Sequence, residues 1–93
     1  MTAYNSRQFA KMRQQIRAYE ETHISLNALI VDLTFLMVAL EEIDGNWGHH
    51  FSQAVVDLES VNAYMLEKGI DSPDEFTSTV VSKAIAELVK LIP

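Results

Sequence analysis

The fold is decided by residues 25–45, which read SLNALIVDLTFLMVALEEIDG. Apolar residues recur in this stretch at i, i+3, i+4 and i+7, the spacing that places side chains on one face of an α-helix. The stretch therefore predicts a helix over 25–43. Its main apolar stripe consists of Leu26, Leu29, Ile30, Leu33, Leu36, Met37 and Leu40.

The other side of the same helix is also apolar, because Val31, Phe35 and Val38 form a second face. A helix that is apolar nearly all round is normally central in a bundle, so we predict that this helix is the most buried element. Ser25 is a favourable N-cap residue. Gly45 follows the acidic end of the pattern, and we expect it to take the left-handed conformation that closes a helix.

Three further amphipathic patterns predict helices over 6–21, 47–68 and 73–92. Asn5 is the expected N-cap of the first of these helices, and Ser72 is the expected N-cap of the last. Short connections between the four helices favour antiparallel packing of neighbours. The sequence therefore predicts an all-α fold, a small antiparallel four-helix bundle that forms a single domain over its 93 residues.

Charge is distributed unevenly along the chain, whose formal net charge is −6. Residues 1–19 carry four bases and no acid, 20–67 carry nine acids and no Lys or Arg, and 68–93 carry three bases and four acids. Because phosphate recognition needs Lys or Arg, the acidic stretch argues against a nucleic acid partner and favours a cationic one. The alternative is that these acids only keep a small apolar bundle in solution.

The composition also excludes several classes of protein. The chain has no Cys, which excludes disulfide scaffolds, thiolate zinc sites and Cys nucleophiles. The longest strongly apolar run, 26–40, contains polar residues and is shorter than the roughly 20 residues that span a bilayer. Residues 1–7 lack the pattern of a signal peptide. We therefore expect a soluble, cytoplasmic protein without a membrane partner.

Catalytic and metal-binding patterns are weak. His49 and His50 are the only neighbouring histidines, and adjacent helical residues point about 100° apart, so they are poorly placed to ligate one ion. We expect His49 to face solvent and His50 to lie at the edge of a groove. The sequence has no Glu-x-x-His, His-Glu-x-x-His or Gly-x-Ser-x-Gly motif. The expectation is a protein that is not an enzyme and has no metal or cofactor.

Asp32 is an isolated acid among the apolar residues of the second predicted helix. An unpaired buried carboxylate is costly. We therefore expect Asp32 either to pair with a base on the first helix, such as Arg13 or Arg17, or to reach the surface.

A surface that binds a protein partner is the remaining candidate site. Polar residues and an aromatic residue are spaced at three or four residues along one side of the third predicted helix, and acids at the preceding turn extend this patch. Acids interleaved with an exposed aromatic suit recognition of a basic protein surface, although a solvated face with an incidental Tyr has the same pattern. The predicted partner-binding residues are Glu41, Glu42, Asp44, His49, Gln53, Asp57, Ser60 and Tyr64.

The middle of the chain, over roughly 24–66, resembles a group of small acidic helical bacterial proteins. Some of these serve as immunity proteins in contact-dependent growth inhibition and related polymorphic toxin systems. The most distinctive shared residues are Ala39-Leu40-Glu41-Glu42, Trp47 and Leu58-Glu59. The remaining shared positions are Ile24-Ser25-Leu26, Leu29-Ile30, Asp32-Leu33, Leu36, Phe51 and Ala63-Tyr64.

The resemblance implies a cytoplasmic inhibitor that binds a toxin domain, commonly a nuclease. A nuclease needs a cationic surface to hold nucleic acid, so an acidic inhibitor is its expected electrostatic complement. The alternative is a helical interaction module of another class, such as a homodimer or a secretion-type chaperone. An apolar back face on the second helix that stays exposed would favour this alternative.

Overall fold

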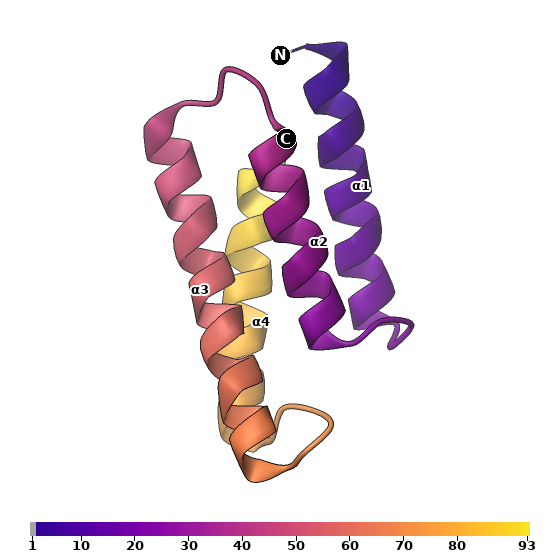
Figure 1. Ribbon diagram of the computed structural model, residues 1–93, viewed down its shortest axis with the longest axis vertical. Coiled ribbons are helices and arrows are strands. Elements are labelled where there is room, and N and C mark those ends of the chain that lie inside the picture. The colour runs from indigo at the N-terminus through magenta and orange to yellow at the C-terminus, as the bar shows by residue number, and fades with distance from the viewer. Residues whose placement is uncertain (1) are drawn as a thin grey trace.

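The computed structural model describes residues 2–93 and confirms an all-α four-helix bundle (Figure 1). Its helices are α1 (Ala3–Glu20), α2 (Leu26–Ala39), α3 (Gly45–Lys68) and α4 (Glu75–Leu91). Consecutive helices pack against each other, so α2 contacts α1 and α3, and α3 contacts α4. Figure 1 shows α2 in front, between α3 and α1, with α4 behind.

The predicted apolar stripes form one shared core. The largest fully buried side chains are contributed by all four helices, which is how each amphipathic helix removes its apolar face from water. They are Met12, Leu29, Leu33, Phe51, Leu58 and Leu88.

Aromatic rings hold the start of α3 against the core. Trp47 stacks on Phe51 with ring centroids 5.0 Å apart and meets Phe9 edge-on at 5.8 Å. Its indole Nε1 donates a hydrogen bond of 2.8 Å to the carbonyl oxygen of Leu91. Because Leu91 ends α4, this bond ties the start of α3 to the end of its antiparallel neighbour.

The first helix starts earlier than expected. Thr2 is its N-cap, and the Thr2 hydroxyl accepts a hydrogen bond of 3.0 Å from the backbone N–H of Asn5. The expectation that Asn5 is the N-cap is therefore wrong. Asn5 lies inside α1, is only 4% exposed, and hydrogen-bonds to the connection between α2 and α3.

The last helix starts later than expected. Its N-cap is Asp74, whose carboxylate accepts a hydrogen bond of 2.8 Å from the backbone N–H of Thr77. The Thr77 hydroxyl in turn accepts one of 2.9 Å from the backbone N–H of Asp74, which completes a capping box. The prediction that Ser72 caps this helix was wrong, because the capping box of Asp74 and Thr77 begins the helix two residues later.

The second helix ends four residues before the predicted boundary at 43. Leu40 is in the extended conformation, and the turn is made by Glu42, whose φ of 52° lies in the left-handed region. The expectation that Gly45 closes this helix is therefore wrong. Gly45 is the first residue of α3.

The second helix has the largest share of buried residues among the four described helices, as predicted, but its second apolar face is left exposed. Val31, Phe35 and Val38 are 56%, 74% and 75% exposed. The reason is topological: α2 packs against α1 and α3 through its main stripe, and α4 lies on the far side of the bundle, so none of the helices within residues 2–93 covers the second face. Within residues 2–93, none of the helices combines the length and the apolarity that a membrane span requires.

Candidate protein-binding surface

The first part of the candidate surface is the segment 40–44 that joins α2 to α3, which we call the acidic connection. The side chains of Glu41, Glu42 and Asp44 are exposed in it. Its backbone is anchored by Asn5, whose amide Nδ2 donates a hydrogen bond of 2.7 Å to the Glu41 carbonyl oxygen. The Glu41 backbone N–H donates one of 3.0 Å back to the Asn5 Oδ1. The carboxylates therefore project from a backbone that is fixed to α1.

The second part is the α3 row, which begins one turn after the acidic connection. It comprises His49, Gln53, Asp57, Ser60 and Tyr64, at intervals of three or four residues that place them on one side of α3. Asp57 and Tyr64 are half-buried, and the other three are exposed. The α3 row is therefore a continuous strip, and it is polar along its whole length.

A small groove between α3 and α4 borders the α3 row. Gln53 and Asp57 line it from α3, and Lys83 and Glu87 line it from α4, around a volume of about 240 Å³. His50 also lines this groove, as expected, and its neighbour His49 is exposed. Lys83 and Glu87 were missed at the sequence level because periodicity gives the faces of one helix but not which helix lies beside it.

Tyr64 is held by a partner within the chain. Its hydroxyl donates a hydrogen bond of 2.9 Å to Oδ2 of Asp74, the N-cap of α4. This bond to Asp74 raises the pKa of Tyr64 above its usual value. The pKa of Asp74 is lowered, first by the backbone N–H of Thr77 and then by the hydroxyls of Thr77 and Tyr64. The Tyr64 hydroxyl is therefore used to position α4, and Nζ of Lys68 lies 5.8 Å from the centre of the Tyr64 ring.

Asp32 does not pair with either expected arginine. Its Oδ2 accepts a hydrogen bond of 2.5 Å from the amide of Gln15, and the residue is half-buried. The pairing with an arginine does not form because the side of α1 that faces α2 contains Gln15 and not Arg13 or Arg17. Arg13 instead hydrogen-bonds to the backbone oxygen of Pro93, and Arg17 is exposed.

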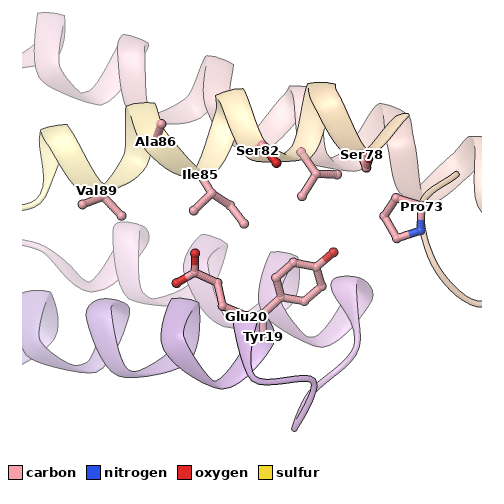
Figure 2. A pocket seen from close by; sticks show the side chains of 9 residues that line it. Tyr19, Glu20, Pro73, Ser78, Ser82, Ile85, Ala86 and Val89 are labelled. Carbon is pink, nitrogen blue, oxygen red and sulfur yellow. The ribbon is translucent and has the colours of Figure 1, made fainter. Parts of the chain in front are cut away.

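A larger groove lies between α1 and α4, with a volume of about 660 Å³ (Figure 2). Tyr19 and Glu20 line it from α1 and lie opposite Ile85 and Ser82 on α4. Burial raises the pKa of the Tyr19 hydroxyl. Val81, Ala86 and Val89 add apolar side chains, so most of the groove is an apolar, open trough between two helices.

Metal ligands are not clustered in the described part of the chain. No group of three or more His, Asp or Glu residues there is arranged to hold an ion. The rings of His49 and His50 lie edge to face, 5.9 Å apart. Comparison with protein-family models, curated proteins and solved structures found no match for the chain.

Proposed function

We propose that this chain is a cytoplasmic immunity protein that binds and neutralises a cognate bacterial toxin domain, a cationic nuclease, through the acidic connection and the α3 row. The observation that supports it most is the acidic connection. Glu41, Glu42 and Asp44 are exposed on a backbone that Asn5 anchors to α1. A pre-organised acidic loop loses little conformational entropy when it meets a partner.

The charge distribution supports a cationic partner. Residues 20–67 contain nine acids and no Lys or Arg, and both parts of the candidate surface lie within that stretch. A nuclease holds phosphates on Lys and Arg, so its substrate-binding surface is positive. Opposed surfaces of this kind accelerate association and disfavour wrong partners.

Two modes of inhibition follow from this arrangement. Carboxylates of the acidic connection would occupy the phosphate sites of the toxin, or the bundle would bind beside the active site and exclude a long substrate. A dinucleotide substrate separates the two modes, because only an inhibitor that fills the active site blocks cleavage of such a small molecule.

The experiment is growth of cells that express the toxin domain encoded immediately upstream, with and without this chain, followed by co-purification of the two proteins. The expected result is restored growth and a stable one-to-one complex of chain and toxin domain. No restoration of growth and no complex would contradict the proposal.

A further inference from the structure

The exposed face of α2 has the spacing of a helix-pairing seam. Ala28, Val31, Phe35 and Val38 follow one another at intervals of three, four and three residues, the a and d pattern of a coiled coil. The three larger side chains are 56%, 74% and 75% exposed. Such a row on a helix that already buries its other stripe is an apolar surface without a partner in the described part of the chain.

The seam carries no charge of its own. The nearest acid on α2, Asp32, accepts the hydrogen bond from Gln15 and lies on the side toward α1. The side of the molecule on which α2 lies in front measures 41 by 26 Å. That extent can accommodate the roughly 800 Å² per partner that a standard interface buries.

The two flanks of the seam have opposite charge. On the α1 side, Lys11 lines the groove that Phe35 also lines. On the α3 side lies the exposed Glu59.

Two bonds show that Glu59 is on the flank of α3 that faces α2. Asn62, three residues after Glu59, donates to Asn27 of α2, and Ser52, seven residues before it, donates to the sulfur of Met37. Residues at these intervals share one side of a helix. The seam is therefore bordered by a base, Lys11, on the α1 side and by an acid, Glu59, on the α3 side.

We propose that α2 packs in parallel against α2 of a second copy of this chain, about a two-fold axis that runs along the helix. Rotation about that axis places the α1 flank of each copy opposite the α3 flank of the other, so the Lys11 side of one copy faces the Glu59 side of the other. An antiparallel pairing would place the α1 flank of each copy against the α1 flank of the other. This self-association goes beyond the proposed function and does not depend on it. It leaves the α3 row free, because that row borders α4.

Sedimentation equilibrium of the purified chain tests this interface. The expected mass is twice the 10.5 kDa of the chain, and Phe35→Glu weakens the association by about 30-fold or more, as loss of an apolar anchor does. Phe76→Glu is the matched control, because Phe76 is 78% exposed on α4 and away from the seam. Circular dichroism of both variants checks that they remain folded. A wild-type chain that stays monomeric at about 100 μM overturns the proposal, and so does a Phe76→Glu variant that weakens the dimer as much as Phe35→Glu.

Charge exchange tests the parallel orientation. Lys11→Glu and Glu59→Lys are each expected to weaken the dimer several-fold, and the double variant is expected to recover most of the loss. Recovery is the result that distinguishes the parallel pairing, since only there do the two flanks meet. Losses that simply add in the double variant would overturn the orientation.

Discussion

Asn5 and Glu41 exchange two hydrogen bonds across 36 residues of sequence: the Asn5 amide donates to the Glu41 carbonyl oxygen at 2.7 Å, and the Glu41 N–H donates to Asn5 Oδ1 at 3.0 Å. A side-chain amide has both a donor and an acceptor, so it can satisfy both backbone groups of a single residue. The pair fixes the acidic connection to the start of α1, and it explains why a polar residue is buried there.

Asn5→Ala is expected to destabilise the fold by about 2 kcal/mol, because it removes both hydrogen bonds to the Glu41 backbone from a side chain that is only 4% exposed. Chemical denaturation measures the change. Asn27→Ala is the control, because Asn27 is exposed and makes a single side-chain contact of 3.4 Å with Asn62. Equal losses in the two variants would contradict the role given to Asn5.

Trp47→Phe is expected to cost about 1 to 2 kcal/mol of unfolding free energy, since it removes the hydrogen bond to the Leu91 carbonyl and part of the stack on Phe51. Thermal unfolding followed by circular dichroism measures it. Phe76→Leu, a change in an aromatic side chain that is 78% exposed, should leave the melting temperature nearly unchanged. A Trp47→Phe variant as stable as the parent chain would refute this prediction.

Thr22→Gly is expected to stabilise the chain by about 0.5 to 1 kcal/mol. Thr22 has a φ of 62°, and the left-handed region is costly for a β-branched residue but not for glycine. Thr34→Gly is the control, and it is expected to destabilise the chain. Thr34 is exposed within α2, where glycine lowers helix stability. If both substitutions lower the melting temperature, the backbone at Thr22 is not strained.

The bond from Tyr64 to Asp74 predicts a pH dependence. The pKa of Asp74 is lowered in the folded chain, so its stabilising effect is present above the usual Asp value of about 4 and is lost as the pH falls through the lower folded value. Tyr64→Phe removes one donor to the carboxylate, so the pKa of Asp74 rises toward its usual value. An NMR titration of the Asp74 carboxyl carbon measures this shift, and an unchanged midpoint would show that the bond does not hold in solution.

The four helices and their core stripes could be predicted because amphipathic periodicity is a local property of the sequence. The first residues of α1 and α4 could not be predicted. Asn5 hydrogen-bonds to the Glu41 backbone instead of capping α1, and the capping box of Asp74 and Thr77, not Ser72, caps α4. The exposure of the second apolar face of α2 could not be predicted for a similar reason. Periodicity reveals that Phe35 lies on an apolar face, but only the arrangement of neighbouring helices decides whether that face is covered.

The candidate surface could likewise be predicted only in part. Exposed acids in the acidic connection follow from a polar run between two apolar helices. The bond between Tyr64 and Asp74, and the proximity of Lys83 to Asp57, depend on how α4 is rotated against α3. That rotation is set by packing of both helices and is not encoded in the spacing of either one.

The most direct test of the central claim is the affinity of this chain for the toxin domain, measured by isothermal titration calorimetry with matched charge reversals. Glu41→Lys with Glu42→Lys reverses two exposed neighbours in the acidic connection, and Glu20→Lys with Glu21→Lys makes the same change in charge near the connection between α1 and α2. The account predicts that the first pair weakens binding by about 10- to 100-fold, while the second pair has an effect several-fold or smaller. Equal affinities for the two double variants would contradict it.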